Sequence, residues 1–224
     1  MTGEWVDLTQ PFDENAPHSA ALPAPEFETL HDVAEEGVNA QWLGTPTPVG
    51  THVDAPRHMV DGGATIDDLP LSRFAGEGVV LDVRRDEPEP ISVADIEAAE
   101  RETSAAGVRP DDIVLLRTGW GDRYGADGYE RYPWLADDVG EWLLERGIKL
   151  LAVDTPSPDR PRAMRPDGWD AYPIHRALLP AGVPIAEHLS IPAALTGTRP
   201  EVFGFPLRLR GGDGAPARFV ARPD

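Results

Sequence analysis

The stretch Gly78-Val79-Val80-Leu81-Asp82-Val83 is an almost continuous apolar run of strand length, and Asp112-Ile113-Val114-Leu115-Leu116-Arg117-Thr118 is a second run of the same kind. Such runs are typical of strands that are buried on both faces of a sheet. Residues 92–100 lie between them and begin with Ser92, a good helix N-cap, ahead of apolar residues at helical spacing. The sequence therefore predicts a strand-helix-strand unit at the centre of an α/β fold.

The same alternation of helix and strand continues along the chain. Residues 136–147 have acidic side chains in their first turn, apolar residues at helical spacing and a closing Gly147, which predicts a helix. Residues 148–154 predict the next strand, which ends at Asp154 in a loop where α/β folds often place ligands. The other expected elements are an opening strand at 5–9, a long loop at 12–30, a short helix at 173–179, and closing strands at 202–209 and 217–221 around a turn at 211–214.

Length and composition indicate one globular domain. The chain has 224 residues with no internal repeat or Gly/Ser linker, so we expect a single domain over residues 1–224. Hydrophobic residues make up 41% and charged residues 26%, which is ordinary globular usage. No apolar run approaches the roughly 18 residues of a membrane span, and the N-terminal residues lack the regions of a signal peptide. We therefore expect a cytoplasmic protein without a membrane partner.

Charge and cysteine content narrow the possible chemistry. The net charge of −19 repels phosphate backbones and no basic stripe offsets it, so nucleic acid is not an expected partner. The chain has no cysteine, which excludes disulfides, thiolate catalysis and sulfur-ligated zinc. No Gly-x-Ser-x-Gly elbow is present, so Ser157 is expected to be a loop hydrogen-bonder rather than a nucleophile. Any metal must be held by His, Asp, Glu or water.

One short segment, Gly50 to Met59 (GTHVDAPRHM), contains three side chains that can bind a metal ion: His52, Asp54 and His58. In an extended strand His52 and Asp54 point to the same side, with Cα atoms roughly 6.6 Å apart, so both can reach one ion. In a straight strand His58 would lie about 20 Å from His52. Pro56 can bend the chain so that the His58 side chain comes back toward His52 and Asp54. The alternative is a packed strand histidine at 52, a turn-forming Asp54 and a solvated His58.

Two distant residues can complete this set. His175 lies in YPIHRALL and Glu187 in PIAEHL, and the proline-glycine turn between these segments can bring both to the same end of the sheet. Each is ordinary by itself, since a helical histidine or a strand-end glutamate is more often structural or solvated. Together with His52, Asp54 and His58 they form a nitrogen and oxygen ligand set that suits zinc or manganese.

These segments resemble the cyclase family of metal-dependent hydrolases, which includes bacterial kynurenine formamidase and isatin hydrolase. The family signature is His-x-Gly-Thr-His-x-Asp-x-Pro-x-His, and residues 48–58 read PVGTHVDAPRH. The likeness covers nearly the whole length in order, through WVDLTQP, VVLDV, DDIVLLRTGW, LLAVDTPSPD, HRALLPAGVPIAEHL and FGFPLRLRGGDGAPARFVA. It implies a mixed, barrel-like β-sheet flanked by helices, of the swivelling β/β/α type, assembled as a homodimer or homotetramer.

The resemblance also implies the metal ligands. Members bind one or two divalent ions, and the residues that match their ligands are His52, Asp54, His58, His175 and Glu187. The signature's first histidine is Pro48 here, and a proline side chain cannot coordinate a metal. We therefore favour one zinc or manganese ion over two. His18, His31 or His188 can substitute for the missing ligand, and a chain that binds no metal and reuses the pocket is the alternative.

The reaction that the resemblance implies is hydrolysis of an amide, formamide or lactone bond in a small cyclic or aromatic molecule. A bound ion would lower the pKa of a coordinated water toward about 7, and a histidine left off the metal, His58 or His52, would act as general base. Trp120 and His18 are the expected substrate contacts. The early loop at 14–25 lacks the tryptophan and proline stretch of formamidases, which argues against kynurenine formamidase itself.

Two other functions fit the same residues. The family also contains members assigned to ring closure in secondary metabolism, and Pro48, as a departure from the hydrolytic signature, favours such a cyclase. The second alternative is a non-catalytic binding protein with a degenerate metal site. Metal content and turnover discriminate between these possibilities.

Overall fold

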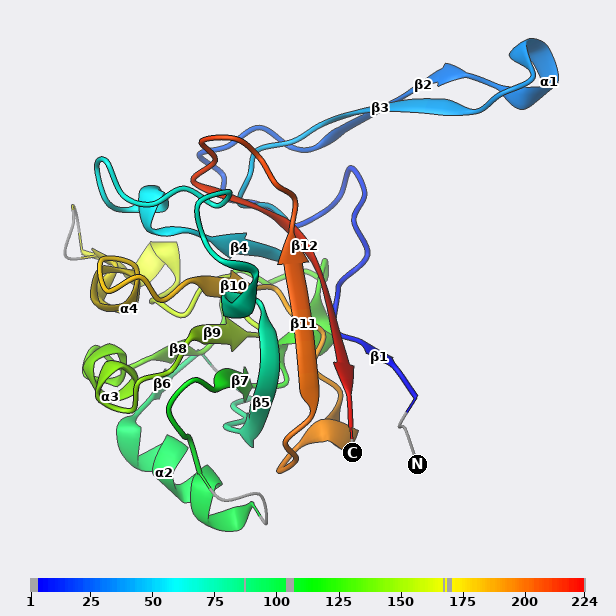
Figure 1. Cartoon of the computed structure of the whole chain (residues 1–224). Helices are drawn as coiled ribbons and strands as arrows, with labels where there is room; N and C mark the ends of the chain where they lie inside the picture. Colours follow the sequence, from blue (N-terminus) through cyan, green and yellow to red (C-terminus); the bar gives the residue numbers. More distant parts are fainter. Residues whose placement is uncertain (1–3, 87, 104–106, 167, 169–170, 224) are drawn as a thin grey trace.

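A closed barrel of seven strands forms the centre of the computed structural model, which describes residues 4–86, 88–103, 107–166, 168 and 171–223 (Figure 1). Around the ring the strands are β12 (Gly214–Arg222), β11 (Glu201–Pro206), β5 (Ala75–Asp82), β7 (Ile113–Arg117), β9 (Leu150–Val153), β10 (Ile185–Glu187) and β4 (His52–Asp54), and β4 pairs back with β12. Strands β5, β7, β9 and β10 run parallel and the other pairs are antiparallel. This confirms the predicted α/β fold with a mixed, barrel-like sheet.

Strand alternation explains the apolar runs that predicted the sheet. In β7, Ile113 and Leu115 point into the barrel, whereas Val114 and Leu116 point outward into a second core beneath the helices. All four side chains are fully buried. Because both faces of the strand are covered, no polar residue occurs in it before Arg117 at its end.

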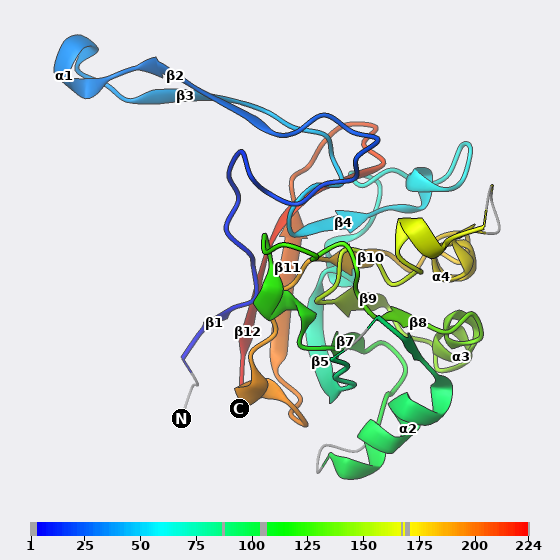
Figure 2. The ribbon, with the colours of Figure 1, turned by 180° about the vertical axis from the view of Figure 1, so that it is seen from behind.

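Three helices cover one side of the barrel, as Figures 1 and 2 show: α2 (Val93–Glu102), α3 (Val139–Glu145) and α4 (Pro173–Leu178). Helix α2 begins as predicted, because Ser92 Oγ accepts from the Asp95 N–H at 3.3 Å and Asp95 Oδ2 accepts from the Ser92 N–H at 2.8 Å. Helix α3 begins three residues later than predicted and the closing strands have shifted bounds. No helix in the described part of the chain is long and apolar enough to cross a membrane.

The remaining elements are short. Strand β1 (Val6–Asp7) pairs with β12 outside the ring, and β6 (Pro90–Ile91) pairs with β8 (Trp134–Leu135). The 3-10 helices are η1 (Pro56–His58), η2 (Leu71–Arg73), η3 (Trp120–Arg123), η4 (Arg162–Met164) and η6 (Ala193–Leu195).

The prediction of one long loop over residues 12–30 is wrong at its C-terminal end. Strand β2 (Glu26–His31) starts there and pairs with β3 (Ala40–Gly44), with the single turn α1 (Val33–Glu36) between them. We call residues 26–44 the arm, because this hairpin extends away from the barrel (Figures 1 and 2). Every residue of β2 is exposed, so the hairpin has no core face whose apolar pattern would mark it in the sequence.

Candidate metal centre

Adjacent strands place three ligand-type side chains on the same face of the barrel wall. In the antiparallel pair β4 and β10, His52 lies directly opposite Glu187. Val53 and Ala186 belong to the barrel core, so His52, Asp54 and Glu187 point to the other face. The neighbouring strand β12 places Gly214 opposite Asp54, where a Cβ atom would lie 2.6 Å from Val53 O. A glycine at this position therefore lets β12 pair closely with the strand that carries Asp54.

A bend after β4 returns His58 to the same site, as the sequence predicts. Ala55 is still extended, and Pro56 then begins the 3-10 helix η1, in which the His58 N–H donates to Ala55 O at 2.9 Å. His58 Nδ1 consequently lies 3.7 Å from Asp54 Oδ1. Gly50, with φ of 62°, precedes the strand, and a side chain there would meet the Phe12 ring at 2.6 Å.

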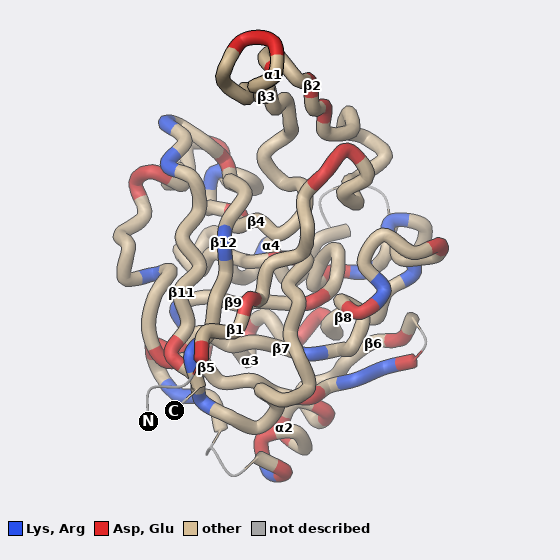
Figure 3. Tube along the Cα trace, turned by 90° about the vertical axis from the view of Figure 1, so that its right-hand side faces the viewer, with Lys and Arg blue, Asp and Glu red and all other residues tan. Residues whose placement is uncertain are grey.

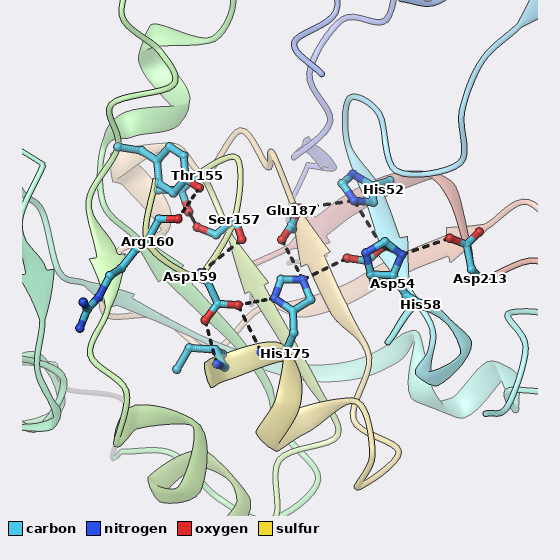
Figure 4. Close-up of polar contacts among 12 residues, drawn as sticks. His52, Asp54, His58, Thr155, Ser157, Asp159, Arg160, His175, Glu187 and Asp213 are labelled. Atoms are coloured by element: carbon cyan, nitrogen blue, oxygen red, sulfur yellow. Dashed lines mark hydrogen bonds and ion pairs between the residues drawn. The ribbon is translucent and has the colours of Figure 1, made fainter. Parts of the chain in front are cut away.

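Helix α4 places His175 over these strands (Figure 4). The helix starts with Pro173, and the fully buried Asp159 accepts the Ile174 N–H at 2.8 Å. The same carboxylate lies 2.5 Å from His175 Nδ1. Asp159 therefore holds the start of the helix and fixes the imidazole ring, so that Nε2 faces Asp54 and Glu187.

The two central carboxylates each span two histidines (Figure 4). His52 Nε2 lies 3.6 Å from Asp54 Oδ1 and 3.4 Å from Glu187 Oε2. His175 Nε2 lies 3.5 Å from Asp54 Oδ2 and 3.4 Å from Glu187 Oε1. These separations exceed the roughly 3.2 Å limit of good N–H···O hydrogen bonds. Ligand atoms about 2.0–2.1 Å from a tetrahedral ion lie about 3.3 Å from one another, so the distances fit coordination better than hydrogen bonding.

Unpartnered polar atoms support the same conclusion. His52 Nε2, Asp54 Oδ1 and Glu187 Oε1 are buried and have no hydrogen-bond partner. A buried polar atom without a partner costs about 1–3 kcal/mol, and a bound divalent cation would satisfy all three atoms of this cluster. The residues present therefore fit a divalent ion with nitrogen and oxygen ligands.

Burial and neighbouring charges shift the pKa values of the cluster in opposite directions, and the charges prevail. Burial disfavours the charged form of His52, but Asp54 and Glu187 outweigh it and raise the pKa of His52 to about 9. The pKa of His175 is likewise raised against burial, by its hydrogen bonds to Asp159, Asp54 and Glu187. Burial would raise the pKa of Asp54, but the charges of His58 and His52 hold it well below its ordinary value. The buried carboxylates therefore favour the positively charged forms of His52 and His175, and a bound divalent ion would supply the same positive charge.

His58 differs from the other histidines of the site. Its Nδ1 lies 3.1 Å from Asp213 Oδ2, and the Thr47 hydroxyl donates to the other oxygen of Asp213 at 2.7 Å. The His58 side chain is 24% exposed, whereas those of His52 and His175 are 2% and 4% exposed. Burial opposes the charged ring, but Asp54 and Asp213 raise the pKa of His58 above its ordinary value. His58 therefore has its own orienting carboxylate and access to solvent.

The structure brings together all five predicted ligands, and it gives the two predicted substrate contacts, His18 and Trp120, hydrogen-bond partners of their own. His18 and His31 are exposed, and His18 Nδ1 lies against Ala16 O at 3.0 Å. Trp120 is only 3% exposed and donates its indole N–H to Tyr129 O at 2.9 Å. Trp120 therefore has little exposed surface, and its indole group holds the backbone of Tyr129.

Three residues of the site have roles that the sequence analysis missed. Asp159 and Asp213 orient His175 and His58, and the Tyr129 hydroxyl lies 3.0 Å from Nδ1 of His188. Asp213 stands in a Gly-rich stretch that predicts only a turn, and its distance in sequence from His58 hides the contact. Asp159 could have been found from its place in the sequence: it lies in the loop 154–159 that follows a predicted strand, where α/β folds often place ligands.

Comparisons with known proteins identify the family. A family model described as "Putative cyclase" matches residues 6–160, and the chain belongs to this cyclase family. It is 30% identical to the kynurenine formamidase of Bacillus cereus over 99% of both chains. It superposes on isatin hydrolase A of Labrenzia aggregata with a TM-score of 0.85 and 25% identity, over 98% of this chain and 93% of that one.

A third relative carries a more general description. The structure of a "potential metal-dependent hydrolase with cyclase activity" matches 99% of this chain and 98% of its own, with a TM-score of 0.79 and 27% identity. Because the family match and the full-length relatives agree, the chain is an enzyme of the cyclase family. The alternative of a non-catalytic binding protein is not supported.

Replacing Asp159 by asparagine is expected to weaken metal binding without removing a ligand. The amide cannot accept the His175 N–H and the Ile174 N–H as strongly as the carboxylate, and loss of such an outer partner typically costs 10–100-fold in metal affinity. Competition with a chromophoric chelator measures this change. The exposed Asp127→Asn is the matched control, and equal affinities for the two variants would contradict the role given to Asp159.

Metal binding is expected to weaken as the pH falls. Because the pKa of His52 in the metal-free protein is about 9, an ion must displace its proton at neutral pH. The raised pKa stabilises the metal-free fold below about 6.5, the ordinary value for histidine, and this stabilisation is lost as the pH rises through about 9. The increase in Tm on adding Zn²⁺ should therefore be larger at pH 8.5 than at pH 6.0. An increase that does not depend on pH would contradict these protonation states.

Proposed function

We propose that this enzyme is a metal-dependent hydrolase that cleaves an amide, formamide or lactone bond in a small cyclic or aromatic molecule. The observation that carries the proposal is the position of Asp54 and Glu187, each within 3.4–3.6 Å of both His52 and His175. The names of the relatives, kynurenine formamidase, isatin hydrolase and metal-dependent hydrolase, support the same reaction class. Zinc or manganese suits the nitrogen and oxygen ligands.

Asp54, His175 and Glu187 would hold the ion, and His52 lies beside the same carboxylates. A divalent ion bound there lowers the pKa of water and polarises a substrate carbonyl. The protein's own part begins with Asp159, which keeps the lone pair of His175 Nε2 directed at the ion site. The Gly50 carbonyl has the same role for His52, since it lies 2.8 Å from Nδ1.

His58 is the general base in this proposal. Asp213 orients the ring and stabilises the imidazolium that forms when His58 takes a proton from the attacking water. The oxygen of that water bonds to the acyl carbon as the bond to the leaving nitrogen or oxygen breaks. His58 then returns the proton to the leaving group, so one water is consumed and one acid is formed.

Aromatic side chains beside the cluster support an aromatic or cyclic substrate. The rings of Tyr124 and Tyr129 lie 5.9 and 5.7 Å from the ring of His188, and Tyr124 lies 5.6 Å from Tyr129. The Tyr124 hydroxyl is buried without a hydrogen-bond partner, which suits a polar group on a bound molecule. These tyrosines replace Trp120 and His18 as the proposed substrate contacts.

Ring closure is the second candidate, because Pro48 departs from the hydrolytic signature and one relative is described as having cyclase activity. Reaction in oxygen-18 water separates the two. With isatin and an N-formylated aromatic amine as probes, hydrolysis places one heavy oxygen in the acid product. Absence of turnover with both probes and with simple lactones, by protein loaded with Zn²⁺ or Mn²⁺, would overturn the hydrolase proposal.

We also propose that the protein assembles as a homodimer or homotetramer through the arm. Six large apolar side chains of the arm are 37–56% exposed: Phe27, Leu30, Val33, Val38, Trp42 and Leu43. The arm has five carboxylates and no lysine or arginine, and Figure 3 shows the acidic residues at its tip. A groove of about 300 Å³ on the barrel is lined by the exposed Leu71 and Leu207, with one basic and one acidic side chain, Arg208 and Asp67, so its apolar side chains can pack against those of a second copy's arm.

Sedimentation velocity tests this assembly. The wild-type protein should sediment as a dimer or tetramer, and the double variant Trp42→Ser with Leu43→Ser should sediment as a monomer at micromolar concentration. Both substitutions lie at exposed positions and should leave the fold of the barrel intact. A wild-type monomer, or a double variant that keeps the oligomer, would rule out assembly through the arm.

A further inference from the structure

We infer that His188 supplies the imidazole that Pro48 cannot, so that His52, Glu187 and His188 hold a second divalent ion beside the first. This inference rests on the proposed function, because it takes a divalent ion as the cofactor. One ligand atom from each of these three residues lies within 4.8 Å of the other two, and all three residues are buried. Asp54, His58 and His175 form a separate group at the same spacing, in which His58 is half-buried and is the general base of the proposed function.

The backbone of His188 directs its side chain toward this group. Residues that follow one another in a strand point to opposite faces, so a regular strand would turn His188 away from Glu187. His188 instead has φ of 57°, in the left-handed region that non-glycine residues seldom adopt. Its N–H donates to Thr155 O at 3.0 Å and its carbonyl accepts from the Thr51 hydroxyl at 2.7 Å. Both bonds hold the conformation that places His188 on the same side as Glu187.

The ring nitrogens of His188 follow the pattern of the other buried histidines. His52 Nδ1 faces the Gly50 carbonyl and His175 Nδ1 faces Asp159, which leaves Nε2 of each for the site. In His188, Nδ1 lies 3.0 Å from the Tyr129 hydroxyl, and the His188 and His52 rings lie 5.9 Å apart. A hydrogen-bond partner on one ring nitrogen, with the other nitrogen bound to the ion, is typical of a metal-binding histidine.

Both ion positions have an unpartnered atom of their own. The second position contains His52 Nε2, and Glu187 Oε1 faces the first position; both atoms are buried without a hydrogen-bond partner. His52 Nε2 is also held 3.4 Å from Glu187 Oε2. The sequence analysis favours one ion because of Pro48. The geometry around His188 argues for two, with a ligand drawn from a different segment of the chain.

Metal stoichiometry tests the inference. After loading with Zn²⁺ and dialysis, elemental analysis should find about two equivalents in the wild-type protein and about one in His188→Asn. Asparagine tolerates the left-handed conformation, so this variant should fold. The exposed His31→Asn carries the same substitution outside the site and should keep two equivalents. A wild-type protein with one equivalent at most, or a His188→Asn protein that keeps two, would overturn the inference.

A second variant tests the role of the His188 imidazole while leaving the ring in place. Tyr129→Phe deletes the hydroxyl next to His188 Nδ1, and we expect the second equivalent of Co²⁺ to bind at least about 10-fold more weakly while the first is unchanged. The visible absorption of Co²⁺ reports each equivalent separately. Unchanged binding of both would argue against His188 as a ligand. Two bound ions with no hydrolysis of any probe would instead contradict the proposed function alone.

Discussion

Asp54→Asn is expected to lower kcat/KM by about 10³-fold or more and to reduce bound metal below half of the wild-type content. Like Glu187, Asp54 has one oxygen facing each of two histidines, at 3.6 Å from His52 and 3.5 Å from His175. An amide places an NH₂ group where one of these oxygens stood, so one ion position loses its anionic ligand. Loss of the ion removes several kcal/mol of transition-state stabilisation, and each 1.36 kcal/mol is about a tenfold change in rate.

Elemental analysis and turnover of the same sample check this expectation. Asp61→Asn makes the same change at an exposed carboxylate close in sequence and should match the wild-type protein. If Asp54→Asn retained full metal content and activity, the carboxylate would be a structural residue and the site would lie elsewhere.

His58→Gln is expected to lower kcat by about 10²–10⁴-fold, the usual contribution of a general base. Metal content should stay unchanged, because His58 Nδ1 already faces Asp213 and because Asp54, His175 and Glu187 remain. The variant should also lose the part of the kcat/KM pH profile that reports the titration of this base. These three readouts together separate a base from a ligand.

The neighbouring Arg57→Gln is the control, since Arg57 is exposed and only its backbone takes part in η1. A His58→Gln protein that loses metal in proportion to activity would show that His58 is a ligand, the second of the two roles that the sequence assigned to it.

The sequence predicts the central strands well because strands buried on both faces leave continuous apolar runs, as Val114 and its neighbours in β7 show, whereas the barrel-like sheet was implied by the family resemblance. Proline and strand alternation also predict the local geometry of the signature, including the return of His58 after Pro56. The sequence analysis groups His52 with Glu187 as ligands but does not predict that their strands pair, because no local pattern specifies which strands become neighbours.

Other parts of the site depend on tertiary contacts that no pattern in a single sequence predicts. The left-handed backbone of His188 decides whether its ring faces Glu187 or the barrel, and histidine carries no such preference by itself. Asp213 resembles an ordinary turn residue until the fold places it 3.1 Å from His58. The arm was missed for a different reason: its strands bury no face against the barrel, so the usual periodicity has no cause to appear.

Anomalous diffraction from crystals grown with Zn²⁺, recorded on both sides of the zinc absorption edge, is the most direct test of the central claim that Asp54 and Glu187 jointly hold a catalytic cation. The structure predicts strong anomalous density between these two carboxylates, within bonding distance of His175 Nε2. Absence of density there, in protein that contains less than about a tenth of an equivalent of zinc although it was loaded at a pH where the histidines are neutral, would contradict the claim.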